Sequence, residues 1–109
     1  MDLRNVVVAI SGASGSIYGI RVLQMLRQVE DVNSHLVITP SAKSTIGVET
    51  EYSVSEIEEL ADEVHSARDI GASIASGSFK TVGMIVAPCS IKTLLSLIHI
   101  SEPTRPALI

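Results

Sequence analysis

The sequence lacks tryptophan and has only three other aromatic residues, Tyr18, Tyr52 and Phe79, among its 109 residues. Burial therefore has to rest on the aliphatic side chains of valine, isoleucine, leucine and alanine. A chain of this length has room for one small domain and not for two. This composition favours an α/β core, in which parallel strands are buried on both faces.

Basic residues and cysteines are also scarce, and long hydrophobic runs are missing. Eight lysines and arginines against twelve acidic residues give a net charge of −4, and no basic cluster is present, which argues against nucleic acid as a partner. The single cysteine, Cys89, excludes an internal disulfide. The first apolar run, residues 6–10, is too short for a signal peptide or a membrane span. We therefore expect a soluble, cytoplasmic protein that has no membrane partner.

Three apolar runs of strand length predict a parallel sheet. Residues 6–10 form a continuous run rich in β-branched residues, which is typical of a central parallel strand. Residues 35–39 and 82–87 follow as the second and third strands, each stopped by a proline. Because helical segments connect them, we expect a Rossmann-like (flavodoxin-like) α/β fold with right-handed crossovers and strands in the order 2-1-3.

The segments between these strands carry helical patterns. Apolar residues recur at three-to-four spacing over residues 17–29, and a second helix is predicted over 41–48, beginning at Pro40. Residues 53–63 predict a third helix, which is acidic and opens with a capping box formed by Ser55 and Glu58. Residues 67–80 are rich in small side chains and show no clear period, so either a short helix or a loop fits them.

Polar residues gather where the predicted strands end, which is where open α/β sheets bind ligands. The turn over residues 11–16 offers backbone N–H groups, three serine hydroxyls and a helix N-terminus, all of which suit a phosphate. Thr39 and Ser41 follow the second strand, and residues 90–93 follow the third. These groups predict a phosphorylated ligand with a planar ring. The glycine spacing matches neither a P-loop nor a dinucleotide fingerprint, so an ordinary tight turn with a capping serine is the alternative.

Other reactive residue types are isolated in the sequence. Glu49, at the end of the second predicted helix, is a candidate acid or base, although such a residue is more often simply solvent-exposed. Cys89 has no histidine near it in sequence and is interpreted as a packing residue. The three histidines share no metal-ligand spacing, so no metal site is predicted. His35 is interpreted as a strand residue and His65 as a surface or capping residue.

Three separated stretches resemble the flavin prenyltransferases, often called the UbiX family. They are VAISGASGSIYG at 8–19, ARDIGASIASGSF at 67–79 and PCSIKT at 88–93, in the family's order. The resemblance implies a flavodoxin-like fold, a homo-oligomer of twelve subunits and FMN bound between subunits. It further implies transfer of the dimethylallyl group of dimethylallyl phosphate to N5 and C6 of reduced FMN, without a metal ion. The product, prenylated FMN, would serve a partner decarboxylase, including those of ubiquinone synthesis.

The resemblance also assigns residues to this chemistry by position. It implies that FMN is contacted by Gly12, Ala13, Ser14, Thr39, Ser90, Ile91, Lys92 and Thr93. Ser14 and Glu49 match family positions close to the reacting isoprenoid, where Glu49 would handle a proton or stabilise positive charge. Thr39 stands where the family often has serine, and Pro40 stands where it commonly has lysine.

Two other functions are compatible with part of this pattern. One is a different flavoprotein of the same fold, similar to the cysteine decarboxylases, which share the FMN site but oxidise a peptidyl thiol. The other is a non-catalytic FMN-binding module. Glu49 and the segment 90–93 favour the prenyltransferase.

Residues 95–109 depart from the family pattern. The stretch LSLIHISEPTR at 95–105 is what a common transposase sequencing adapter encodes when it is read in frame. We therefore expect residues 1–94 to be the N-terminal part of a flavin prenyltransferase domain and residues 95–109 to be a non-native tail. A three-stranded sheet without further strands would expose an apolar edge, so we expect the chain to be unstable and inactive.

Overall fold

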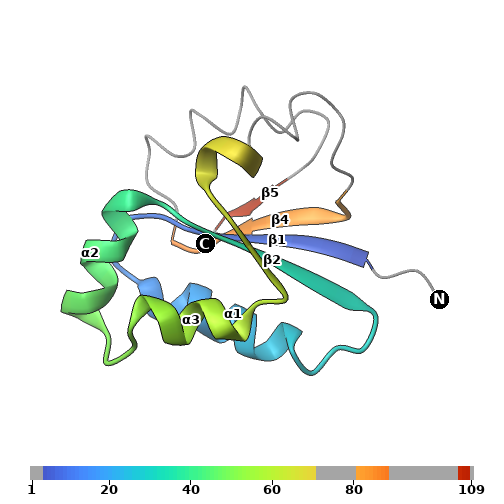
Figure 1. The fold of residues 1–109 in the computed structure, drawn as a ribbon, viewed down its shortest axis with the longest axis horizontal. Coiled ribbons are helices and arrows are strands. Elements are labelled where there is room, and N and C mark those ends of the chain that lie inside the picture. Colours follow the sequence, from blue (N-terminus) through green and yellow to red (C-terminus); the bar gives the residue numbers. More distant parts are fainter. Residues whose placement is uncertain (1–3, 71–80, 89–105, 109) are drawn as a thin grey trace.

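A five-stranded parallel sheet forms the centre of the molecule (Figure 1), in a computed structural model that describes residues 4–70, 81–88 and 106–108. Its strands are β1 (Arg4–Ile10), β2 (Val32–Ile38), β3 (Glu63–His65), β4 (Gly83–Val86) and β5 (Pro106–Leu108). They lie in the order β3-β2-β1-β4-β5, and each neighbouring pair is parallel. The three predicted strands are β1, β2 and β4, and their predicted order is confirmed.

Two short strands extend the sheet beyond the prediction. The third helix was predicted to run to residue 63, which is wrong: α3 ends at Leu60, the chain turns at Asp62, and residues 63–65 pair with β2 as the unpredicted strand β3. The Asp62 carboxylate accepts hydrogen bonds from the Ser34 amide (2.8 Å) and hydroxyl (3.2 Å), which fixes this turn at the sheet edge. At the other side, β5 pairs with β4, where an exposed edge was expected.

Three helices accompany the sheet: α1 (Ser16–Leu26), α2 (Pro40–Glu49) and α3 (Val54–Leu60). α2 begins at Pro40 as predicted, and its N-cap is Thr39, whose hydroxyl oxygen accepts from the Ala42 amide at 3.3 Å. None of the helices in the described ranges is long and apolar enough to cross a membrane.

The capping box of α3 lies two residues earlier than predicted. Ser53 Oγ accepts from the Glu56 amide at 3.1 Å, and Glu56 Oε1 accepts from the Ser53 amide at 3.0 Å. The prediction of Ser55 and Glu58 is therefore wrong. A start at Val54 places this residue against the core together with the fully buried Ile57.

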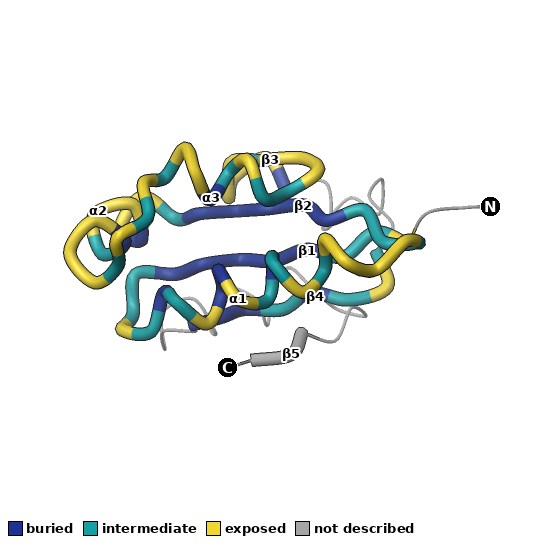
Figure 2. The backbone as a smooth tube through the Cα atoms, turned by 90° about the horizontal axis from the view of Figure 1, so that it is seen from below, coloured by how far each residue is buried: buried dark blue, intermediate teal, exposed yellow. Residues whose placement is uncertain are grey.

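The sheet separates two apolar cores. On one face Val8, Ile10, Leu36 and Ile38 pack against residues of all three helices, namely Ile20, Leu23, Ala42, Ile46 and Ile57. On the other face Val7, Ala9, Val37, Met84 and Val86 pack with Ile70. Figure 2 shows the buried stretches of β1 and β2 running through the middle of the molecule.

This arrangement defines where the chain changes direction across the sheet. Connections from β1 to β2 and from β2 to β3 carry helices on the first face, whereas Ile70, on the way from β3 to β4, packs on the second. The carboxyl ends of β1 and β4 therefore border a topological switch point, the usual place for a ligand in such sheets.

Candidate functional site

The glycine turn, which we define as residues 11–16, leaves the carboxyl end of β1 and enters α1. Gly15 is the N-cap of α1 and has φ of 106°, a left-handed conformation that favours glycine. No side chain caps this helix, so the alternative of a capping serine is wrong. The backbone N–H groups at the start of α1 therefore point beyond the turn, where a group from another part of the molecule can accept from them.

A carboxylate lies at this helix start. Glu49, the last residue of α2, places Oε1 3.2 Å from the Gly15 amide nitrogen and 3.3 Å from the Ser16 hydroxyl, and both groups donate to it. Glu49 is exposed, whereas Ser16 is fully buried. Donors of the turn for which the sequence predicted a phosphate thus bind a carboxylate oxygen, as N–H groups at a helix N-terminus favour anionic oxygens.

These donors also set the protonation state of Glu49. The Ser14 hydroxyl, the largest effect, holds the pKa of the Glu49 carboxyl below its ordinary value. Burial, the next largest effect, opposes it, and the Gly15 and Ser16 donors lower the pKa further. Near neutral pH Glu49 is therefore a carboxylate. The interpretation of Glu49 as a solvent-exposed residue is correct, but the hydrogen bonds from Gly15 and Ser16 also fix its side chain in place.

Helix α2 packs against the same turn and forms a hydrogen bond with it. Thr45 Oγ1 donates to the Gly12 carbonyl at 3.1 Å. A side chain at Gly12 would overlap the Ser41 side chain, so only glycine allows α2 to come this close. Thr39 accepts from Ala42 as the cap of α2, and its hydroxyl hydrogen can still be donated to Ser41 or to a ligand.

The carboxyl end of β4 lies beside the turn. The buried Ser11 hydroxyl donates to the Pro88 carbonyl, and the Ala87 amide donates to the Ala9 carbonyl at 3.0 Å. The segment that leads towards residues 90–93 therefore starts next to the glycine turn. Residues Cys89, Ser90, Ile91, Lys92 and Thr93 lie outside the described residues.

The predicted site residues that the structure describes thus share one edge of the sheet. Gly12, Ala13 and Ser14 lie in the glycine turn, Thr39 caps the helix that braces it, and Glu49 returns to it from the far end of that helix. The sequence did not show that Glu49 reaches Gly15 and Ser16, because more than 30 residues separate them.

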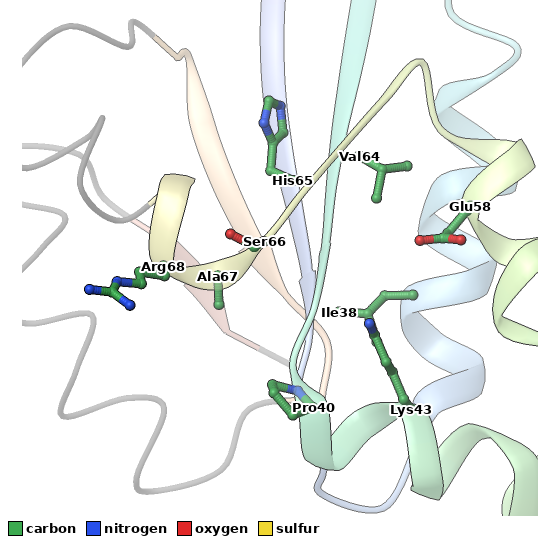
Figure 3. A pocket seen from close by; sticks show the side chains of 9 residues that line it. All are labelled: Ile38, Pro40, Lys43, Glu58, Val64, His65, Ser66, Ala67 and Arg68. Atoms are coloured by element: carbon green, nitrogen blue, oxygen red, sulfur yellow. The ribbon is translucent and has the colours of Figure 1, made fainter.

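A separate hollow of about 500 Å³ lies on the β2–β3 side of the sheet. Ile38, Pro40, Lys43, Glu58, Val64, His65, Ser66, Ala67 and Arg68 line it, and none of these is a predicted site residue. Figure 3 shows Lys43 and Glu58 extending toward this hollow from α2 and α3, whereas Arg68 points away from it.

Sequence reasoning missed one polar cluster altogether. His35, Glu63 and His65 come together on the paired strands β2 and β3. The search for local metal-ligand spacing failed because the two histidines are 30 residues apart in the chain. The signal that would have found them is the parallel register of the two strands, which required β3 to be identified first.

Comparisons with known proteins show the family to which the chain belongs. The family model described as "Flavoprotein" matches residues 1–99. This chain belongs to the flavoprotein family. Over 97 residues it is 54% identical to the flavin prenyltransferase UbiX of Escherichia coli K12, a match that covers 89% of the chain and 51% of that relative. The resemblance to the flavin prenyltransferases is therefore confirmed, and this flavoprotein chain spans about half the length of the curated relatives it matches.

Solved structures of UbiX proteins share the flavoprotein's fold. One is a UbiX protein in complex with FMN and dimethylallyl pyrophosphate, with 47% identity and a TM-score of 0.78, matched over 87% of this chain and 50% of that one. Another is a dodecameric FMN-dependent UbiX-like decarboxylase from Escherichia coli O157:H7, with 38% identity and a TM-score of 0.84, over 96% and 65% of the two chains. The flavodoxin-like fold predicted from the sequence is confirmed.

Proposed function

We propose that this chain is the FMN-binding part of a flavin prenyltransferase, which joins the dimethylallyl group of dimethylallyl phosphate to reduced FMN. The observation that carries the proposal is the Glu49 carboxylate, bound to Gly15 and Ser16 at the topological switch point. It occurs in a chain 54% identical to a known flavin prenyltransferase. The cysteine decarboxylase-like alternative gives Glu49 no comparable role.

The glycine turn fits FMN in its donors and in its steric demands. Gly12, Ala13 and Ser14 supply small side chains and backbone groups at a helix N-terminus, which suits a phosphate or a flavin edge. Thr39 adds a hydroxyl from the neighbouring strand end. We propose Ser90, Ile91, Lys92 and Thr93 as the second half of this site, following the family pattern. Their segment begins beside the turn, where Ser11 binds the Pro88 carbonyl.

The residues of this chain would act on charge and position. Reduced FMN, when bound, supplies the nucleophilic N5 and C6 atoms. Glu49, held ionised by its hydrogen-bond donors, would stabilise positive charge on the allyl group as its bond to phosphate breaks, or would accept a proton afterwards. Ser14, beside Glu49, would orient that carboxylate. No residue described here needs a metal ion for these roles.

We also propose the assembly and the setting of the enzyme. A UbiX-like relative is a dodecamer, which supports a homo-oligomer of twelve subunits with FMN between them. The product would serve a partner decarboxylase in the cytoplasm. Ligands of the prenyl phosphate would come from the half of the relatives that this chain does not span.

The tail is a further part of the proposal. We propose that residues 1–94 are native and that 95–109 derive from adapter sequence, on the match of residues 95–105 to an adapter translation. Reading the source DNA beyond the codon for Leu94 tests this. The C-terminal half of a flavin prenyltransferase is expected there, and a genomic copy that encodes residues 95–109 would contradict it.

The reaction is tested with the complete protein encoded by the source gene. Incubated anaerobically with reduced FMN and dimethylallyl phosphate, it is expected to form prenylated FMN, identified by its mass. Glu49→Gln is expected to slow this reaction by about 100-fold or more. The 109-residue chain is expected to form no product. Absence of product from the complete protein, or oxidation of a C-terminal cysteine peptide instead, would refute the proposal.

A further inference from the structure

A polar cluster of His35, Glu63 and His65, which we call the histidine–glutamate cluster, lies on the second face of the sheet. Glu63 and His65 are two residues apart on β3, so their side chains leave the same face. His35 on β2 is paired in register with Glu63. Each residue offers one atom that could bind a metal ion, and these three atoms lie within 4.8 Å of one another. The glycine turn contributes nothing to this cluster.

The distances are close to those of a metal site. His35 Nδ1 and His65 Nε2 are 2.8 Å apart, and the two rings are stacked with their centroids 5.1 Å apart. Around a tetrahedral zinc ion, with bonds of about 2.0–2.1 Å, ligand atoms stand about 3.3 Å from one another. The two ring nitrogens would therefore have to move apart by about 0.5 Å to hold a zinc ion. The Glu63 side chain, 51% exposed, has the freedom to turn toward the rings, whereas that of His35 is 4% exposed and held.

Two asparagines, Asn5 and Asn33, form hydrogen bonds with residues of the cluster. His35 Nε2 lies 3.0 Å from Asn5 Oδ1 and 3.5 Å from Glu63 Oε2. When His35 donates its Nε2–H there, Nδ1 accepts the hydrogen bond from His65 Nε2 at 2.8 Å, and a metal ion would replace that hydrogen bond. Asn33 Nδ2 donates to Glu63 Oε2 at 2.7 Å, and lies 3.0 Å from His35 Nε2 and 3.3 Å from Asn5 Oδ1. Metal-binding histidines and carboxylates are typically oriented by such partners, which fix the tautomer and the ring position.

We propose that His35, Glu63 and His65 bind a divalent transition-metal ion, with Zn²⁺ as the best match to two imidazoles and one carboxylate. This donor set suits zinc and leaves a fourth position for water. The ion would tie β3, an edge strand of three residues, to β2. The proposal is independent of the proposed function.

Zinc binding is tested on the 109-residue chain, purified without a histidine tag and stripped of metal. Titration with zinc chloride against a chromophoric chelator is expected to give one site per chain, and zinc is expected to raise the temperature of thermal unfolding. His65→Gln and Glu63→Gln, each half-buried or exposed, are expected to weaken zinc binding by about tenfold or more while the chain stays folded. His99→Gln, which removes the third histidine, is the matched control and is expected to bind as the parent does.

Other outcomes would overturn the proposal. A folded chain that binds no zinc at micromolar concentration would show that the three side chains only link β2 and β3 by hydrogen bonds. Binding that survives both His65→Gln and Glu63→Gln, or that disappears with His99→Gln, would place the ion elsewhere. Circular dichroism of each variant separates loss of the site from loss of the fold.

Discussion

Glu49 joins two elements that are distant in sequence, because the last residue of α2 binds the first donors of α1. The same contacts that position the carboxylate also keep it ionised, as donors to a carboxylate favour its charged form. A residue that the resemblance marks as close to the reacting isoprenoid is therefore also a local structural link. The two roles can be separated by measuring stability and activity on the same variant.

The stability contributed by Glu49 is expected to depend on pH. Since its pKa in the folded chain lies below the ordinary value of 4.5, its contribution is complete well above pH 4.5 and is lost as pH falls through the lowered pKa. The parent is therefore expected to be more stable than Glu49→Gln at neutral pH, by a difference that shrinks in acid. Thermal unfolding of both chains across this range measures it.

Glu51→Gln is the control for that experiment, because it removes a nearby exposed carboxylate that lies outside the glycine-turn contacts. A stability difference between parent and Glu49→Gln that stays constant from neutral pH into acid would mean that the carboxylate's charge does not matter to the turn.

The identity of the site residues was more accessible to the sequence than their contacts. Strand ends and family motifs in the sequence pointed to Gly12, Ser14, Thr39 and Glu49. The structure places all four at one edge of the sheet. The bond from Thr45 to the Gly12 carbonyl depends on how α2 packs on the turn. The side-chain contact of His35 with His65 depends on the register of β2 and β3, which no local pattern encodes.

At the scale of the elements, α3 offers a test of its corrected N-terminus. Ser53→Ala removes the hydroxyl that accepts from the Glu56 amide, and is expected to cost about 1 kcal/mol of unfolding free energy. Ser55→Ala, at the position that the sequence favoured, is expected to have little effect. Urea unfolding of the two variants compares them, and a larger loss for Ser55→Ala would restore the original prediction.

The packing of α1 on the sheet depends on Gly19. A Cβ at this position would stand 2.5 Å from the Ala87 carbonyl oxygen and 2.7 Å from Ile10 Cγ1. Gly19→Ala is therefore expected to destabilise the chain by about 1–3 kcal/mol, as overpacked cores do. The matched change Gly47→Ala adds a methyl group with nothing within 4 Å, inside α2, and is expected to stabilise by about 0.5–1 kcal/mol.

Denaturant unfolding of both glycine variants gives the comparison directly. Equal stabilities would mean that α1 shifts away from β1 at little cost, and that the close approach at Gly19 does not fix the glycine turn.

The strands differed in how readily the sequence predicted them. β1 and β2 contribute buried residues to both cores and β4 contributes Met84 and Val86 to the second, and the apolar pattern of the sequence records this burial. β3 has two exposed residues and one of intermediate burial, and it follows an acidic helix, so its residues look like a continuation of that helix. Only pairing with β2 makes it a strand.

At the scale of the whole molecule, strand order decides where a ligand can bind. Because the helices lie on one face as far as β3 and Ile70 lies on the other, the chain's crossovers diverge between β1 and β4. The glycine turn, the start of α2 and the end of β4 converge there. This convergence follows from the order of β2, β1 and β4, which the sequence predicted correctly although it missed two strands.

The flavin-binding edge of the sheet is tested most directly by equilibrium dialysis of FMN against the complete protein encoded by the source gene. One FMN per chain is expected to bind in the micromolar range. Gly12→Ala, which forces a side chain into Ser41, is expected to weaken binding by about tenfold or more, and Gly83→Ala, where a Cβ meets nothing within 4 Å, is expected to leave it unchanged. A folded chain that binds no FMN, or that binds it equally well with Gly12→Ala, would contradict a flavin site at the glycine turn.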